Sequence, residues 1–546
     1  MIRSACGVEK TAFFSQESHF TTLPQRIWKR KDILLFAAGS LPCVRTLYFR
    51  AIADDALQQL VICPISQREY AAGSYLHKLA VRLSQALDRT GLSAVIFYAS
   101  CAELLTGCDF DLLLKEVDNP QGIPIHILRR GPLNARTRSP GSDLDKILAA
   151  IPETGRSLDK MSLELPPPPP DFSGIASLLQ GWDIYPFLLT PGGCTGCISL
   201  ADGMGEDFFL ERSRFTDLEL AVGGESLAVE GIAAGFAEAG RNLCCIMGSP
   251  IPALIGMDTD FIVQKLAVKG VPALYLPCSG YEAAQTGITK ALLRLGKELL
   301  PLENRQERKI NVLGWSPLAF AGKEVLQEAV AFLRNQGFKV AFWGQGSLEE
   351  SKKGGEACLN WVVAAEGIGL ARWMKQELAI PYFEGLPLGQ AGMNHWQQKI
   401  AALLGFPFQD KAFLEPPDSR QERVLLLGQP LVLRALHSFL TTELGFSRIS
   451  MGLYAPTADL CRLFSPYTDE GMFLFADPSA LLEGGEGPRM ILSDPLLFPV
   501  LSQLFPAAGL YPLYDPMLSG RWIIQEKLLT FDEKGGEFIR QLLFSQ

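Results

Sequence analysis

The sequence predicts an α/β protein built from several doubly wound, Rossmann-like domains with parallel sheets. Three observations support this fold class. The apolar runs KINVLG, from Lys309, and VLLLG, from Val424, are each followed by a longer helical pattern. Another apolar run follows each helical pattern, and none of these runs alternates with polar residues. Unbroken apolar runs are typical of parallel strands covered by helices on both faces, so we expect right-handed strand, helix, strand units.

Length and charge narrow the class of protein further. The chain has 546 residues, with 50 Lys and Arg against 59 Asp and Glu, and a net charge of −9. At about 100 to 200 residues per domain, this length predicts roughly three to five domains. The sequence has no dense stripe of basic residues of the kind that binds nucleic acid. No apolar run in it approaches the roughly 18 residues of a membrane-spanning helix. We expect a cytoplasmic protein with neither nucleic acid nor membrane as a partner.

The twelve cysteines are too sparse for the disulfide framework of a small secreted protein. In a reducing compartment they are core thiols, metal ligands or redox groups. Unclustered ones such as Cys63, Cys358 and Cys461 are expected to pack as small apolar side chains. Cys244 and Cys245 are adjacent on an expected strand, where successive side chains point to opposite faces, so core packing is expected for both.

Domain boundaries follow from proline and charge. The run from Pro166 to Pro170 predicts a stiff polyproline spacer that stays outside any core. Two similar polar segments, RQER before KINVLG and RQER before VLLLG, each precede a buried strand. These features predict α/β units at 1–160, 172–300, 305–412 and 420–546, with a proline-rich linker at 161–171.

The first two units resemble each other. The segment from Val95 aligns with the segment from Cys244, which places Gly107 over Gly256 and Asp109 over Asp258. Upstream, two further pairs share an offset of 151, namely Cys43 over Cys194 and Gly73 over Gly224. Matches that involve several different residue types predict that residues 1–160 are a diverged copy of the next unit.

The segment TPGGCTGC places Cys194 and Cys197 in a Gly-rich turn after the apolar run IYPFLL. Thiols at the end of a parallel strand are well placed to bind a ligand. The residues alone leave two interpretations open, a metal or redox site and thiols packed in a tight turn.

The segments after this turn resemble a known family. SRFTDLELAVGGESL, IMGSPIPALIGMDTDF and GVPALYLPCSGY, in this order, resemble the first domain of nitrogenase component 1 proteins. KINVLG and the later segment IPYFEGLPLG resemble the second domain, and residues 420–546 resemble the third domain loosely. The resemblance implies the domain architecture of nitrogenase component 1 subunits.

The resemblance also implies candidate ligands, because the family binds iron–sulfur clusters through Cys thiolates at subunit interfaces. Cys194 matches the cluster Cys of the family's Gly-Cys turn, whereas the second ligand position is Pro250. In the first unit, Cys43 takes the turn position and Cys101 the second position. Cys6 is a candidate for the remaining, N-terminal ligand, and Cys197 is a further candidate beside Cys194.

The function implied is that of a nitrogenase-like oxidoreductase subunit. It would accept low-potential electrons through an iron–sulfur cluster, expected to be [4Fe-4S], and reduce a bound substrate or cofactor. The implied partners are an ATP-dependent iron–sulfur reductase and either a homologous second subunit or a second copy of the chain. A further metallocofactor or a tetrapyrrole is a second possible ligand. Two alternatives stay open: a scaffold for metallocofactor assembly, and a metal- or tetrapyrrole-binding protein without redox cycling.

Overall fold

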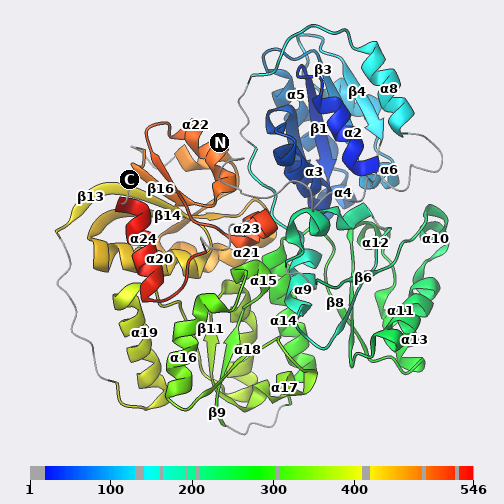
Figure 1. The fold of residues 1–546 in the computed structure, drawn as a ribbon. Coiled ribbons are helices and arrows are strands. Elements are labelled where there is room, and N and C mark those ends of the chain that lie inside the picture. The colour runs from blue at the N-terminus through cyan, green and yellow to red at the C-terminus, as the bar shows by residue number, and fades with distance from the viewer. Residues whose placement is uncertain are drawn as a thin grey trace.

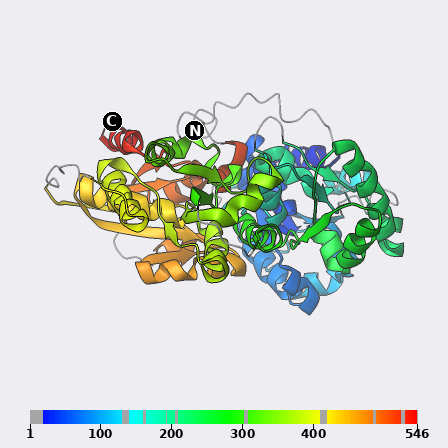
Figure 2. The same ribbon diagram turned by 90° about the horizontal axis from the view of Figure 1, so that it is seen from below.

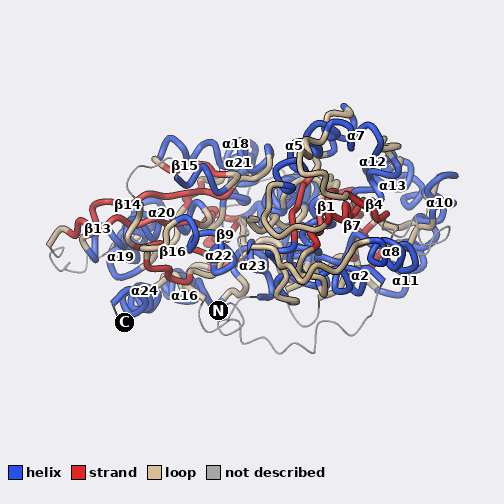
Figure 3. Tube along the Cα trace, turned by 90° about the horizontal axis from the view of Figure 1, so that it is seen from above, coloured by secondary structure: helices blue, strands red, loops and turns tan. Residues whose placement is uncertain are grey.

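The computed structural model describes nine stretches of the chain. They are residues 19–129, 140–159, 164–191, 193–204, 208–301, 307–408, 418–482, 487–522 and 528–544. Within them, four sheets follow one another along the chain, and all of their paired strands are parallel (Figure 1). Helices enclose each sheet, as the blue tubes around the red strands show in Figure 3. The predicted fold class is therefore confirmed.

The first sheet has the strand order β2-β1-β3-β4. Its central strands are buried along their whole length, as expected of runs such as ILLFAAG that are apolar on both faces. The strands are β1 (Ile33–Gly39), β2 (Leu60–Pro64), β3 (Ala94–Ala99) and β4 (Ile125–Arg129). The helices are α2 (His19–Trp28), α3 (Leu41–Ala53), α4 (Gln67–Ala72), α5 (Tyr75–Leu87), α6 (Cys101–Leu105), α7 (Phe110–Glu116) and α8 (Pro140–Ala150).

The second sheet repeats this order as β6-β5-β7-β8. Its strands are β5 (Tyr185–Leu188), β6 (Glu211–Arg212), β7 (Cys244–Met247) and β8 (Ala273–Leu276). Its longer helices are α9 (Asp171–Leu179), α10 (Asp217–Val222), α11 (Glu225–Ala239), α12 (Pro250–Ile255), α13 (Thr259–Val268) and α14 (Ala284–Leu299). Two short helical segments follow β5, namely η2 (Gly193–Thr195) and η3 (Ile198–Asp202).

The third sheet has the order β10-β9-β11-β12. Its strands are β9 (Glu307–Leu313), β10 (Lys339–Phe342), β11 (Ala357–Val362) and β12 (Tyr382–Glu384). Its helices include α15 (Pro317–Phe320), α16 (Gln327–Asn335), α17 (Leu348–Lys352), α18 (Ile368–Leu378) and α19 (Gly389–Leu404).

The fourth sheet gains a strand and has the order β15-β14-β13-β16-β17. Its strands are β13 (Arg420–Leu427), β14 (Phe446–Tyr454), β15 (Met472–Phe475), β16 (Met490–Ser493) and β17 (Gly509–Pro512). Its helices include α20 (Pro430–Leu444), α21 (Ala458–Phe464), α22 (Phe498–Leu504), α23 (Pro516–Ser519) and α24 (Glu533–Phe544). Among the helices that the structure describes, none has both the length and the apolar character needed to cross a membrane.

Strand register shows how the first two units correspond. Leu34 in β1 pairs with Val95 in β3, and Tyr185 in β5 pairs with Cys244 in β7. Cys43 lies nine residues after Leu34, and Cys194 lies nine residues after Tyr185. The two cysteines therefore occupy equivalent positions after β1 and β5.

One proposed correspondence shifts by a residue. Gly73 has φ +70°, a left-handed conformation that favours glycine, and it ends the short helix α4. Gly223 ends the matching helix α10 with φ +92°, whereas Gly224 has φ −82°. Ser66 and Thr216 begin these two helices with the same capping box. The backbone thus matches Gly73 with Gly223, and the sequence pairing of Gly73 with Gly224 was wrong.

The proline run is buried, which corrects the prediction that it stays outside any core. All five residues from Pro166 to Pro170 are buried. Arg45 donates to the Pro167 carbonyl over 2.5 Å, and the backbone of Ala284 donates to the Pro169 carbonyl over 2.8 Å. Because proline has no N–H group, burial leaves no backbone donor unsatisfied, while its ring adds apolar contact.

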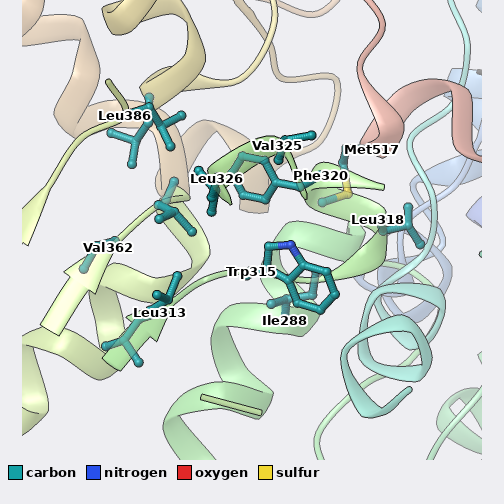
Figure 4. Close-up of a cluster of buried hydrophobic side chains, with 14 of the residues drawn as sticks. Ile288, Leu313, Trp315, Leu318, Phe320, Val325, Leu326, Val362, Leu386 and Met517 are labelled. Atoms are coloured by element: carbon teal, nitrogen blue, oxygen red, sulfur yellow. The ribbon is translucent and has the colours of Figure 1, made fainter. Parts of the chain in front are cut away.

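The last three sheets share one hydrophobic core. Figure 4 shows Trp315, Leu318 and Phe320 from the segment after β9 meeting Ile288 of α14 and Met517 of α23. These side chains therefore join the second, third and fourth sheets. In Figure 2 the first two units occupy one half of the molecule and the last two the other half.

A buried ion pair ties four segments together. The side chains of Arg45 in α3 and Asp202 at the end of η3 are both 0% exposed, and Nε lies 2.7 Å from the carboxylate. The remaining guanidinium nitrogens donate to the carbonyls of Pro167 and Leu518, over 2.5 and 3.0 Å. The guanidinium also lies 4.6 Å from the centre of the Phe49 ring. Arg45 thereby joins the first unit to the linker, the second unit and α23.

We predict that Arg45→Ala destabilises the folded chain strongly. Removing one partner of a buried ion pair leaves the other charge uncompensated, at a cost of about 3–5 kcal/mol. Chemical unfolding followed by tryptophan fluorescence measures this loss. Arg294→Ala removes a half-exposed arginine that lies 3.9 Å from Glu298, and is expected to cost no more than about 1 kcal/mol. Equal effects of the two changes would contradict the assignment.

Candidate functional site

Two candidate cysteines follow neighbouring strands of the first sheet. Strands β1 and β3 are adjacent, and ligands of doubly wound sheets bind beyond the strand ends where the connections diverge. Cys43 is the third residue of α3, which follows β1, and Cys101 is the first residue of α6, which follows β3. Both thiols therefore lie at the carboxyl edge of the same sheet.

Close packing brings these two strand ends together. Gly39, at the end of β1, has φ +139°, and a Cβ atom there would lie 3.0 Å from Ser100 Oγ and 3.3 Å from Cys43 Cβ. A side chain at this position would therefore push the two ends apart. Ser40 donates a hydrogen bond to the Cys43 sulfur over 3.7 Å, which helps to orient the thiol.

The second sheet presents the equivalent edge. Cys194 lies in η2 after β5, and Pro250 begins α12 after β7. Ser249 precedes α12 as Ser100 precedes α6, and both serines are almost fully buried. The four equivalent positions of the two units therefore hold Cys43, Cys101, Cys194 and Pro250.

The two edges face each other across the contact between the units. Gly196 packs so closely on α3 that an added Cβ atom would lie 3.0 Å from Thr46 Oγ1, and α6 contacts α12. Burial raises the pKa of the Cys194 thiol, and the thiols of Cys43 and Cys101 raise it further. The structure thus brings three of the predicted site cysteines together from two sheets.

Hydroxyl groups surround these thiols. Ser249 and Thr190 lie close enough to Cys194 to oppose the rise in its pKa. The Ser249 hydroxyl is fully buried and makes no hydrogen bond of normal geometry. Burial raises the pKa of Tyr281, and the thiols of Cys43 and Cys194 add to the rise, so its ring lies beside the same group. We call Cys43, Cys101 and Cys194 the thiol group.

The structure does not bring Cys197 to the thiol group. Its side chain is fully buried, and its sulfur lies 3.7 Å from Ser173 Oγ and 3.8 Å from the backbone carbonyl of Cys194. Burial raises the pKa of Cys197, and the next largest cause is the carboxylate of Asp202 rather than another cysteine. Cys197 therefore packs between η3 and α9. Cys6 lies outside the described residues.

The other cysteines lie in the core or beside it. Cys244 and Cys245 are both 0% exposed and pack on opposite faces of the second sheet, as predicted. Cys278 accepts a hydrogen bond from the Gly248 N–H over 3.2 Å. Within the described residues, no three His, Cys, Asp or Glu side chains are placed to hold a metal ion. The thiols of the thiol group are therefore not gathered around a single ion.

A cavity of about 960 Å³ adjoins the thiol group. Its walls come from the first unit, the proline run, the second unit and the fourth sheet, and Leu41, Gly248 and Tyr281 lie on the side of the thiols. Its basic residues are Arg68, Lys78, Arg82, Lys290 and Arg462. Sequence reasoning missed this cavity because its walls come from segments far apart in the chain.

Thiol alkylation tests the geometry of this site. A thiol with a raised pKa holds little thiolate at pH 8, so we predict that iodoacetamide modifies buried Cys194 much more slowly than partly exposed Cys461. The rate for Cys194 should keep rising with pH above 9. Peptide mass spectrometry at several pH values measures both rates. A rate for Cys194 equal to that for Cys461, levelling off near pH 8.5, would contradict the described burial.

Comparison with known proteins finds a relative that is similar to part of this chain. One curated relative is a subunit of the light-independent protochlorophyllide reductase of Roseobacter denitrificans, which is 23% identical over 225 residues. That match covers 38% of this chain and 44% of the relative, so the chain spans less than half of the relative's length.

Solved structures show the same fold. Nitrogenase Cp1 at pH 6.5 superposes with a TM-score of 0.52 and 15% identity, covering 73% of this chain and 96% of that chain. Nitrogenase Cp1 at pH 5 gives a TM-score of 0.51 and 14% identity, covering 69% and 88% of the two chains.

A family model adds the decisive match. The model of nitrogenase component 1 type oxidoreductases matches residues 176–470, which is more than half of the chain. The match includes the second and third sheets and part of the fourth, and leaves the first sheet outside it. This agrees with the resemblance that the sequence motifs carry. The chain belongs to the nitrogenase component 1 type oxidoreductase family.

Proposed function

We propose that this chain is an iron–sulfur oxidoreductase subunit that accepts low-potential electrons at the thiol group and delivers them to a substrate in the adjoining cavity. The observation that carries this proposal is the convergence of Cys43, Cys101 and Cys194 from the edges of two sheets. Packing in a hydrophobic core does not by itself account for three thiols that meet at equivalent strand ends.

The thiol group fits an iron–sulfur cluster in chemistry. Thiolate is a soft, anionic ligand that suits iron, and cluster irons are usually held by Cys. In a [4Fe-4S] cluster each thiolate binds a different iron, so the ligands stand farther apart than around one ion. Two observations agree with this wider spacing. The thiols of Cys43 and Cys101 lie close enough to Cys194 to raise its pKa, and the described residues include no site for a single metal ion.

The surrounding side chains would support such a ligand. Iron binding requires the thiolate form, and buried Cys194 loses its proton with difficulty. The hydroxyls of Ser249 and Thr190 can donate hydrogen bonds to that thiolate and so lower the cost. A cluster bound here would supply electrons at low potential. Tyr281, 5% exposed, lines the cavity and also lies beside the thiol group.

A tetrapyrrole is our first candidate for the substrate. One relative is named for the reduction of protochlorophyllide, a tetrapyrrole. The cavity, about 960 Å³, lies at the upper end of the usual range of small-molecule pockets, about 300–1,000 Å³. Arg68 and Arg462, on walls from the first unit and the fourth sheet, suit the carboxylates of such a ligand. A further metallocofactor is the second candidate.

The proposed electron donor is an ATP-dependent iron–sulfur reductase. We keep a homologous second subunit, or a second copy of this chain, as a proposed partner. The thiol group itself is assembled within one chain, because both of its halves come from consecutive units.

Iron content tests the proposal. After anaerobic purification and reconstitution, we expect stoichiometric iron and sulfide and an electron paramagnetic resonance signal on reduction with dithionite. Cys43→Ala, Cys101→Ala and Cys194→Ala should each lose most of the iron, because each removes a thiolate ligand. Cys197→Ala, which removes a thiol held apart from the group, and Cys461→Ala should keep it.

Two results would reject this function. Wild-type protein without stoichiometric iron would do so, and so would unchanged spectra in all three variants of the thiol group. Turnover with reductase, ATP and substrate separates a reductase from an assembly scaffold, which would instead release its cluster to an acceptor protein.

A further inference from the structure

We propose that Pro250 withholds the fourth protein ligand, so that a cluster at the thiol group keeps one iron open to an external anionic ligand that arrives through the cavity. This inference rests on the proposed function, because it needs a cluster. It goes beyond that function by assigning a binding site on one particular side of the thiol group.

The equivalence of Pro250 and Cys101 carries the first step. Each is the first residue of a short helix that follows the third strand of its sheet, and each comes directly after a buried serine. Six residues after each of these positions lies a glycine with positive φ, Gly107 and Gly256. Residue 250 therefore holds the position in its unit that Cys101 holds in the first unit, directly after Ser249, which lies close to Cys194. A proline side chain there has no donor atom for iron.

The neighbours of Pro250 do not replace the missing thiolate. Ser249 and Tyr281 place hydroxyls near it, and the Tyr281 hydroxyl donates to the Pro250 carbonyl over 3.5 Å. Neutral hydroxyls are weak ligands for iron compared with thiolates.

The cavity adjoins the side of the thiol group at which Pro250 stands in place of a cysteine. Gly248, directly before the helix, and Pro252 and Ala253, inside it, all line the cavity. The helix that carries the missing ligand position is therefore itself a wall of the cavity, next to Tyr281. An anion bound in the cavity approaches the thiol group from the side that lacks a protein ligand. The walls carry five basic and five acidic residues, and Lys290 is paired with Glu282 among them. The anion is therefore selected by its affinity for iron rather than by the charge of the cavity.

Restoring the fourth thiol is the direct experiment. Wild type, Pro250→Cys, Pro250→Ala and Ala253→Cys are reconstituted, checked for iron and oxidised with ferricyanide. Removal of one electron converts [4Fe-4S]²⁺ to the 3+ state, which divides into [3Fe-4S]⁺ and Fe²⁺ when one iron lacks a thiolate. We expect wild type and Pro250→Ala to show the [3Fe-4S] resonance, and Pro250→Cys to show it several-fold more weakly.

Ala253→Cys is the matched control, because it adds a thiol to the same helix at a position that is not equivalent to Cys101. It should behave as wild type. A second readout uses ¹³C-labelled cyanide as the anionic probe. Electron nuclear double resonance of the reduced cluster should detect coupling to ¹³C in wild type and Ala253→Cys, and not in Pro250→Cys.

The outcomes separate this inference from the function on which it rests. Wild type that binds no iron overturns both. Wild type that binds iron but neither loses it to ferricyanide nor binds cyanide overturns the open site alone, and Cys6→Ser then shows whether Cys6 supplies the fourth thiolate. If Pro250→Cys fails to load iron, the wild-type responses to ferricyanide and cyanide still decide the question.

Discussion

The buried pair of Arg45 and Asp202 is the interaction on which the arrangement of the other parts depends. Its two partners follow site cysteines closely in the sequence, since Arg45 lies two residues after Cys43 and Asp202 lies eight residues after Cys194. Two charges without access to water are costly unless each is fully hydrogen-bonded. Here the guanidinium meets a carboxylate and two carbonyls, and the carboxylate also accepts from Ser173 over 2.9 Å. These bonds hold α3, η3 and the proline run together at the contact between the two units.

The first unit completes the site that the second unit begins. Sheet order, strand register and helix caps are shared by the two, yet their ligand positions differ. The first unit keeps both thiols, and the second keeps one and replaces the other with Pro250. The family model matches only the later part of the chain, so the first unit diverged while it kept the backbone that places its cysteines.

Much of this could be predicted from the sequence, because apolar runs and helix caps act locally. The α/β class and the equivalence of Cys43 with Cys194 depend on such local signals. The burial of the prolines and the placement of the Cys197 thiol beside Ser173 depend on tertiary contacts, which residue spacing does not reveal. Cys197 lies only three residues from Cys194, but packing of η3 against α9 turns its thiol toward Ser173. The cavity, with walls from distant segments, left no local signal at all.

The proline run also affects how the two halves of the thiol group associate. A covalent tether of this kind turns docking into an intramolecular event with a high effective concentration, and a polyproline segment limits the range over which its ends can move. Pairing of the two units therefore does not depend on the amount of protein in solution. Dilution that would separate two weakly bound subunits leaves these two units at a one-to-one ratio, joined through a linker that includes the five buried prolines.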